Sequence, residues 1–244
     1  MAEIKKLLVG EGRIFYVKDD TKDYHCQFGF VKKEDLKKKD GSEVLTSIGK
    51  KLVLLSPSFI DKYAKIKRMP QIIPLKDVGA IVALTGIGNK SKVVDAGTGS
   101  GATACFIANI AKYVTSYEIR PDFIKVAEEN VANLGLKNVT LKNHDVCKGI
   151  EEKNVDVVIF DLPNPWEAVE AAAKALKSGG FIVSYSPTIP QVIDYTEKLR
   201  QCGFGQIRTI EIIERDWETE GRKTRPLSQQ IGHSGFITFA RKIS

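Results

Sequence analysis

The chain has 244 residues, of which 43% are hydrophobic and 27% are charged, a balance that is typical of globular proteins and excludes wholesale disorder. No apolar run approaches the roughly 20 residues that a membrane-spanning helix needs, and the first ten residues lack the apolar stretch of a signal peptide. The 37 Lys and Arg residues exceed the 30 Asp and Glu residues by 7, and this moderate excess fits a nucleic-acid partner as well as it fits a basic metabolic enzyme.

The first part of the chain differs in texture from the rest. Short alternating runs such as Arg13–Val17, together with turn signals such as Asp40-Gly41, predict a small β-rich module. Three prolines then mark a transition segment over residues 56–74. We therefore expect one domain over 1–57 and a second over 58–244.

From Lys76 onward, helical and strand patterns alternate. Helices are predicted at Asp77–Leu84, Ala102–Lys112, Pro121–Leu134, Trp166–Leu176 and Gln191–Cys202. Strands are predicted at Lys92–Asp95, Val114–Glu118, Val139–Leu141, Val155–Asp161, Phe181–Tyr185, Gln206–Arg215 and Gly235–Arg241. Gly179-Gly180 is expected to end the fourth helix, and the polar stretch Glu220–Gly235 is expected to be a turn outside the core. The alternation predicts an α/β fold with a largely parallel, doubly wound sheet.

The strongest chemical signal is the run Val93–Ala102, which reads V-V-D-A-G-T-G-S-G-A between a predicted strand and a predicted helix. Its glycines let the backbone approach a ligand closely, and the first amides of the helix face that ligand. The G-x-G-x-G spacing differs from the G-x-G-x-x-G of dinucleotide-binding folds. It resembles the S-adenosylmethionine (AdoMet) loop of class I methyltransferases. The cofactor-binding residues implied here are Gly97, Thr98, Gly99, Ser100, Gly101 and Ala102.

Acidic residues follow the next two predicted strands. Glu118 lies 19 positions after Gly99, where a carboxylate can accept both ribose hydroxyls of a nucleotide, whether AdoMet or NAD. Asp145 ends the third strand. The resemblance to class I methyltransferases implies that Asp145 receives the adenine amino group of AdoMet and that the backbone amide of Val146 faces the adenine ring. We expect the neighbouring His144 to be a partly exposed strand-end residue, not a general base.

The segment Asp161–Trp166, D-L-P-N-P-W, ends the fourth predicted strand, and its two prolines stiffen the backbone behind Asp161. This segment, Gln71-Ile72-Ile73 before the first helix and Gly232–Phe236 (G-H-S-G-F) before the last strand occur in the same order in one family. The chain resembles the tRNA adenine-N1 methyltransferases, which modify adenine at tRNA position 58 and, in archaeal members, also at position 57.

This resemblance covers essentially the whole chain. It implies a small N-terminal β-barrel-like domain on a class I methyltransferase domain with a mostly parallel seven-stranded sheet, assembled as a homotetramer. Asp161 matches the catalytic aspartate of the family and also lies beside the cofactor, while Gln71 is implied beside the methionine end of AdoMet. Many relatives carry an aromatic residue or histidine where Pro74 stands, so the contact with the target base differs here.

The reaction needs no covalent enzyme nucleophile, since adenine N1 carries a lone pair that attacks the sulfonium methyl group. A carboxylate that accepts a hydrogen bond from the exocyclic amine raises electron density at N1 and stabilises the developing positive charge. N1 is blocked in a paired base, so the adenine must leave the tRNA fold to react. Arg222, Lys223 and Arg225 are the candidate tRNA contacts, with a solvated charged loop as the alternative.

Three other interpretations stay open. The chain could methylate a protein or a small molecule, serve as the RNA-binding subunit of a heteromeric methyltransferase, or act as a dinucleotide oxidoreductase. Four widely separated cysteines form no C-x-x-C pair, so no metal site is predicted. Reduced thiols in a cytoplasmic protein are expected, with structural disulfides as the alternative. The sequence leaves open whether one adenine or two adjacent adenines are methylated.

Overall fold

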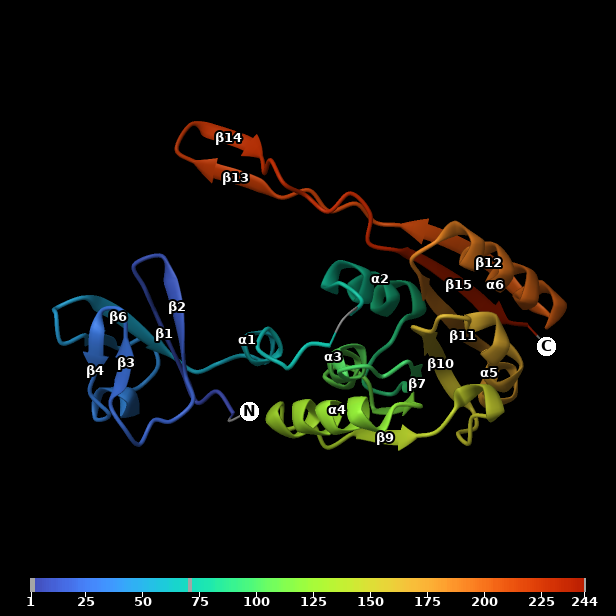
Figure 1. Cartoon of the computed structure of the whole chain (residues 1–244), viewed down its shortest axis with the longest axis horizontal. Coiled ribbons are helices and arrows are strands. Elements are labelled where there is room, and N and C mark those ends of the chain that lie inside the picture. Colours follow the sequence, from blue (N-terminus) through green and yellow to red (C-terminus); the bar gives the residue numbers. More distant parts are fainter. Residues whose placement is uncertain (1–2, 70–71, 244) are drawn as a thin grey trace. The chain divides into compact units, whose positions relative to one another are not determined.

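The computed structural model describes residues 3–69 and 72–243. The chain divides into two compact units, the first comprising residues 1–67 with 132–135 and the second comprising residues 68–131 with 136–244 (Figure 1). The first unit continues to Lys67, whereas the sequence predicts a domain boundary after Pro57. That boundary stays a prediction. Within the described ranges, no helix combines the length and the apolar character needed to cross a membrane.

The first unit is built from short antiparallel strands, as its alternating sequence predicts. Four strands pair in the order β2-β1-β6-β5, namely β1 (Lys6–Gly10), β2 (Arg13–Val17), β5 (Glu43–Leu45) and β6 (Lys51–Leu55). A small hairpin pairs β3 (Tyr24–Cys26) with β4 (Gly29–Val31), and the helical elements are η1 (Asp35–Lys37) and α1 (Phe59–Tyr63). One separate aliphatic core holds the unit together, comprising Leu8, Val17, Val31, Leu36, Val44, Leu52 and Leu54.

The second unit contains a seven-stranded sheet in the order β12-β15-β11-β10-β7-β8-β9. Its strands are β7 (Lys92–Ala96), β8 (Tyr113–Glu118), β9 (Val139–Asn143), β10 (Val155–Phe160), β11 (Leu176–Ser186), β12 (Phe204–Glu211) and β15 (Phe236–Lys242). Neighbouring strands from β11 to β9 are parallel, and β15 runs antiparallel to both of its neighbours. The predicted mostly parallel α/β sheet is thus confirmed.

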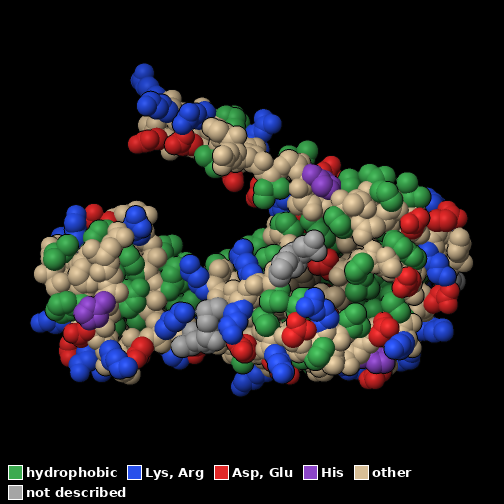
Figure 2. Space-filling model, viewed as in Figure 1, with side chains coloured by type: hydrophobic (Ala, Val, Ile, Leu, Met, Phe, Trp, Pro, Cys, Tyr) green, Lys and Arg blue, Asp and Glu red, His purple; other side chains and the backbone are tan. Residues whose placement is uncertain are grey.

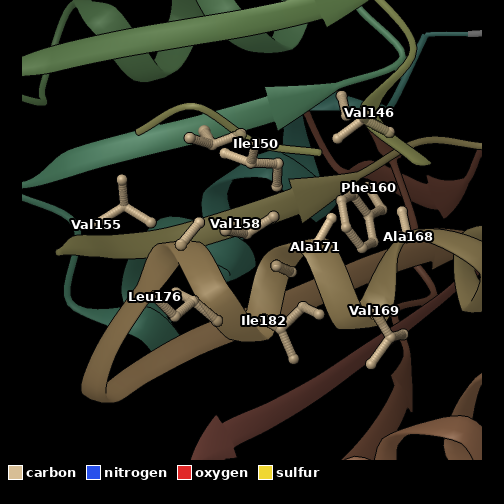
Figure 3. Close-up of a cluster of buried hydrophobic side chains, with 14 of the residues drawn as sticks. Val146, Ile150, Val155, Val158, Phe160, Ala168, Val169, Ala171, Leu176 and Ile182 are labelled. Carbon is tan, nitrogen blue, oxygen red and sulfur yellow. The ribbon is translucent and has the colours of Figure 1, made fainter. Parts of the chain in front are cut away.

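Helices cover both faces of this sheet. They are α2 (Leu75–Thr85), α3 (Ala102–Ala108), α4 (Pro121–Asn133), α5 (Val169–Ala175) and α6 (Ile189–Gln201), with the 3-10 turns η2 (Val146–Lys148) and η3 (Pro165–Ala168). Side chains of α2 and α3 share one core with the sheet, whereas α5 and α6 share the other. Figure 3 shows part of the second core, where α5 and η3 lie over Phe160 and Ile182. Apolar burial on both faces explains the continuous hydrophobic runs of the central strands.

The order of the strands fixes where a ligand can bind. The chain runs outward from β7 through β8 to β9 and then returns to place β10 on the other side of β7. The carboxyl ends of β7 and β10 therefore lie side by side at a topological switch point, where open α/β sheets bind their ligands. Gly97 and Asp161, which follow these two strands, are brought together at this edge.

Two sequence expectations about helices were wrong in detail. The helix expected over Trp166–Leu176 consists of η3 followed by α5, and it ends at Ala175 because Leu176 already pairs with Val155 at the start of β11. Gly179-Gly180 does not end that helix but forms a bulge within β11, with Gly179 at a φ of 79°. The helix expected over Ala102–Lys112 ends earlier, at Ala108.

The polar stretch near the C-terminus was expected to be a turn, but it contains a β-hairpin. Strand β13 (Trp217–Glu220) pairs with β14 (Lys223–Pro226) across a turn at Gly221, whose φ is 56°. Every residue of both strands is exposed, so no alternation of apolar residues marks them in the sequence. The preceding strand β12 correspondingly ends at Glu211 and not at Arg215.

Candidate functional site

The predicted glycine loop lies between β7 and α3, and its glycines occupy positions that other residues do not tolerate. Gly97 has a φ of 89°, and a Cβ atom there would lie 2.0 Å from the carbonyl oxygen of Asp161. Gly101 has a φ of 78° and is the N-cap residue of α3, and a Cβ atom there would lie 3.1 Å from the side chain of Ala127. Gly97 cannot be replaced by a residue with a side chain unless the backbone moves, because the loop backbone lies directly against the residue that follows β10.

Beneath this loop lies Asp95, whose carboxylate is buried at the end of β7. Ser116 donates a hydrogen bond to Asp95 Oδ2, and the hydroxyl groups of Thr98 and Ser116 are 2.6 Å apart. Burial raises the pKa of Asp95 to about 6. Asp95 Oδ1 and Ser100 Oγ are buried without a hydrogen-bond partner among the described residues, which is the state expected of groups that face a polar ligand.

Glu118 closes the loop from the neighbouring strand. The residue is 8% exposed, and its carboxylate oxygens accept hydrogen bonds from the backbone amides of Gly99 at 2.9 Å and Arg120 at 3.0 Å. A carboxylate offers about four lone-pair sites, so two of them stay free for a ligand. Glu118 therefore both orders the glycine loop and retains the capacity to accept ligand hydroxyls.

A pocket of about 270 Å³ opens beside these residues. Its lining brings together four predicted residues, Gly97, Glu118, Asp145 and Val146, which stand at or just after the ends of three different strands, β7, β8 and β9. The rest of the lining comprises Tyr117, Ile119, His144, Cys147, Leu162, Pro163, Asn164 and Glu167. The other predicted residues do not belong to this lining, namely Thr98, Gly99, Ser100, Gly101, Ala102 and Asp161.

Asp145 has a structural role of its own in the pocket wall. Its Oδ1 atom accepts the backbone amide of Cys147 at 3.0 Å and thereby caps η2. This cap fixes the backbone of Val146, which is itself buried. The segment after β9 is therefore held by its own carboxylate, which leaves Asp145 Oδ2 facing Lys148 at a distance of 3.9 Å.

Asp161 follows directly after β10, and its backbone amide donates to the carbonyl of Ala96 at 2.9 Å. Burial, reinforced by the charge of Asp95, raises the pKa of the Asp161 carboxyl group to about 7. A carboxylate that titrates near neutrality at the edge of a pocket is a functional candidate. Its side chain accepts no hydrogen bond from the described part of the chain, so its polar capacity is available to a ligand.

Tyr185 near the end of β11 is a site residue that the sequence analysis missed. It is 8% exposed, and its pKa is raised by burial and further by the charges of Asp77 and Asp161. A tyrosine near the end of a strand carries no distinctive spacing, so no sequence signal separates it from a core residue. Only the pairing of strands brings it near Asp161.

The remaining predicted residues fall in two places. Gln71 lies outside the described residues, and Pro74 stands at the N-cap position of α2. Arg222, Lys223 and Arg225 are exposed on the hairpin, where Arg225 pairs with Glu218 at 2.9 Å. Figure 2 shows basic and acidic side chains on this hairpin, the basic ones mostly along its upper edge in this view and the acidic ones along its lower edge. Among the described residues, no cluster of three His, Cys, Asp or Glu side chains could hold a metal ion.

The chain is similar in sequence to known tRNA methyltransferases. Residues 63–224 match the family model described as the tRNA methyltransferase complex GCD14 subunit. The tRNA (adenine(57)-N(1)/adenine(58)-N(1))-methyltransferase TrmI of Methanocaldococcus jannaschii is 38% identical, over 97% of this chain and 94% of that protein. A tRNA (adenine(58)-N(1))-methyltransferase TrmI of Thermus thermophilus is 34% identical, over 83% of this chain and 81% of that protein.

Solved structures resemble the whole chain. A Thermotoga maritima protein described as a SAM-dependent O-methyltransferase has a TM-score of 0.89 and 31% identity, and the match covers 100% of this chain and 94% of that one. The tRNA (m1A58) methyltransferase TrmI of Aquifex aeolicus has a TM-score of 0.84 and 25% identity, with coverage of 100% and 99%. These matches confirm the class I methyltransferase fold with its N-terminal β-rich part.

Proposed function

The chain belongs to the tRNA methyltransferase GCD14 family, and on that premise we propose that it transfers a methyl group from AdoMet to N1 of adenine in the T-loop region of tRNA. Position 58 is the proposed acceptor, alone or together with position 57. The observation that carries the proposal is the placement of Asp161, whose carbonyl lies against Gly97 of the glycine loop at the edge of the pocket. Similarity to a relative described as acting on both positions supports the second acceptor.

The residues at the switch point fit AdoMet. Ser100 Oγ and Asp95 Oδ1 are buried polar atoms in need of partners, and the carbonyl of Asp161 occupies the space that a side chain on Gly97 would need. Glu118 would hold the ribose hydroxyls, while Asp145 and the amide of Val146 would receive the adenine. Gln71, Thr98, Gly99, Gly101 and Ala102 are proposed to complete the binding site.

In the proposed mechanism, AdoMet supplies an electrophilic methyl group on a sulfonium centre. Asp161 binds the exocyclic amine of the target adenine and orients N1 for in-line transfer. As a carboxylate, it accepts a hydrogen bond from that amine and stabilises the positive charge that develops on the base. A Cβ atom on Gly97 would lie 2.0 Å from the Asp161 carbonyl oxygen, and this close backbone approach supports a catalytic carboxylate next to the cofactor loop.

We propose that this chain is catalytic and is not the non-catalytic RNA-binding subunit of a heteromeric methyltransferase. Relatives in organisms such as Dictyostelium discoideum are described as catalytic subunits, and this chain has both the glycine loop and Asp161 in place. The Thermotoga structure is described as an O-methyltransferase, so a different acceptor is the second candidate function.

We propose in addition that the protein is a cytoplasmic homotetramer, which light scattering would test by a mass four times that of the chain.

Nucleoside mass spectrometry tests the proposed function directly. Unmodified tRNA is incubated with the protein and AdoMet, digested, and analysed for 1-methyladenosine with its position mapped. Product at position 58, alone or with position 57, is expected. A thermal shift with AdoMet but not with NAD(H) is expected as well. Binding of AdoMet without any tRNA product would instead favour the alternative acceptor.

A further inference from the structure

Residues 212–234, here called the arm, connect β12 to β15 and carry the β13–β14 hairpin. Both ends of the arm are held by one lysine that the proposed mechanism does not use. Lys76 Nζ donates to the backbone carbonyl of Ile212 at 2.8 Å, and it lies 2.7 Å from Ser234 Oγ at the other end. Figure 1 shows the hairpin extending from the sheet beyond this point. The base of the arm is thus closed by a single side chain of α2.

This lysine belongs to a buried ion pair. Lys76 Nζ lies 2.8 and 2.9 Å from the two carboxylate oxygens of Asp77, whose side chain is fully buried. Ser234 completes the cluster by donating its hydroxyl hydrogen to Asp77 Oδ2 at 3.0 Å. We call Lys76, Asp77 and Ser234 the latch. A buried charge pair is kept only where its remaining polar atoms are satisfied, and Ser234 and the carbonyl of Ile212 supply those contacts.

The latch reaches the candidate active site through Tyr185. Burial raises the pKa of the Tyr185 phenol, the Ser234 side chain lowers it, and the charges of Asp77 and Asp161 raise it further, so the phenol lies within electrostatic reach of the latch and of Asp161. The next residue, Gly235, lies directly on the tyrosine ring, since a Cβ atom there would lie 2.4 Å from Tyr185 Cζ. No larger residue fits at that position without a shift of the ring. Ser234, Gly235 and Tyr185 are therefore adjacent, and Asp161 acts on the tyrosine through its charge.

We propose that Ser234 is a positioning residue for methyl transfer and that the latch holds the arm in register with Asp161 through Tyr185. This inference rests on the proposed function. Phosphate contacts of exposed basic residues give affinity whatever the register of the arm. Transfer of the methyl group, by contrast, depends on the alignment of the reacting atoms, and small misplacements slow it strongly. Releasing the latch should thus affect the chemical step and not the binding of tRNA.

The test uses Ser234→Ala in the full-length protein, because this change keeps the Lys76–Asp77 pair. The single-turnover rate at saturating AdoMet and tRNA is expected to fall about 10-fold. The dissociation constants for tRNA and for AdoMet should stay within about 3-fold of wild type, since neither phosphate contacts nor the cofactor pocket is touched. Ser234→Thr retains the hydroxyl group and should recover most of the rate. Ser228→Ala, an exposed serine of the same arm, serves as the matched control and should match wild type.

Each outcome decides the inference. A wild-type rate in Ser234→Ala, alongside an active wild-type protein, overturns the latch and leaves the proposed function intact. Equal slowing in Ser234→Ala and Ser234→Thr, with a lowered Tm in both, also overturns it, because the serine would then act only through the stability of the fold. Absence of tRNA methylation by the wild-type protein would overturn the proposed function and with it the latch.

Discussion

Asp161 is a carboxylate in surroundings that favour its neutral form. Burial raises its pKa to about 7, and the neighbouring Asp95 acts in the same direction. The proposed mechanism requires the ionised form, so the site holds a charge at a cost to the stability of the free protein. Such a conflict between local preference and global stability is expected at functional positions.

Replacement of Asp161 tests its catalytic role. Asp161→Ala should fold, bind tRNA through its phosphates and slow the chemical step by roughly 10²–10³, the usual effect of removing one charge-stabilising group. Asp161→Asn keeps an acceptor oxygen but removes the charge, so it should recover only part of the rate. Single-turnover assays at saturating AdoMet and tRNA measure both, with cofactor affinity determined alongside. Near-wild-type transfer by Asp161→Ala would remove this residue from the mechanism.

The same residue makes stability depend on pH in a defined direction. Between its ordinary pKa of 3.8 and its folded value of about 7, the folded chain keeps a proton that the unfolded chain has released. Stability therefore falls as pH rises through this window. Asp161→Asn should raise the Tm of the ligand-free protein at pH 8 and raise it less at pH 5, by scanning calorimetry. Asp194→Asn, at an exposed position on α6, is the control, and an equal gain at both pH values would contradict the assignment.

Glu118 has two tasks in the structure, and its removal should weaken both. It orders the loop through the amide of Gly99 and is proposed to accept ribose hydroxyls. Loss of charge-assisted hydrogen bonds costs roughly 1.5–3 kcal/mol, so Glu118→Ala should weaken AdoMet binding about 10- to 150-fold. Titration calorimetry gives the affinity directly. An unchanged dissociation constant would exclude Glu118 from the ribose site.

At the scale of elements, the β13–β14 hairpin presents basic residues that differ in their availability. Arg225 is paired with Glu218 at 2.9 Å, whereas no ion pair of Arg222 or Lys223 is found within the described part of the chain. The two unpaired residues are therefore the stronger candidates for phosphate contacts. An arginine already neutralised by a glutamate must first give up that partner before it can bind RNA.

Neutralising the hairpin should change how tRNA binding responds to salt. Removal of one lysine or arginine that touches a phosphate lowers the log–log salt slope by roughly one unit. The triple replacement of Arg222, Lys223 and Arg225 by alanine should weaken tRNA binding and flatten this slope, while AdoMet affinity barely changes. Lys125→Ala, on the exposed side of α4, provides a charge-matched control for one site. If the triple variant keeps the wild-type slope, the hairpin is only a solvated surface.

For the whole molecule, the sequence predicted features that depend on neighbouring residues and missed contacts between residues that lie far apart in the chain. The glycine loop and Glu118 were predicted because each stands at the end of a strand at a spacing set by one β-α unit, whereas Asp145 was predicted from the resemblance to class I methyltransferases. Lys76 and Ser234 meet across 158 positions, and no spacing encodes such a contact. The end of α5 was missed for the same reason, since Leu176 is drawn into the sheet by its pairing with Val155.

We expect the second unit to bind AdoMet without the first unit, and we expect the first unit to contribute to tRNA binding. Every residue that lines the candidate cofactor pocket lies in the second unit, and the two cores of that unit share no residue with the core of the first. A fragment of residues 68–244 should therefore fold and bind AdoMet within a few-fold of the full chain, because no pocket contact is removed. Loss of the first unit removes Lys and Arg residues available to RNA, so tRNA binding should weaken and its salt slope should fall. Titration calorimetry with AdoMet and salt-dependent tRNA binding measure the two properties. A fragment that is folded by circular dichroism but does not bind AdoMet would show that the pocket depends on the first unit.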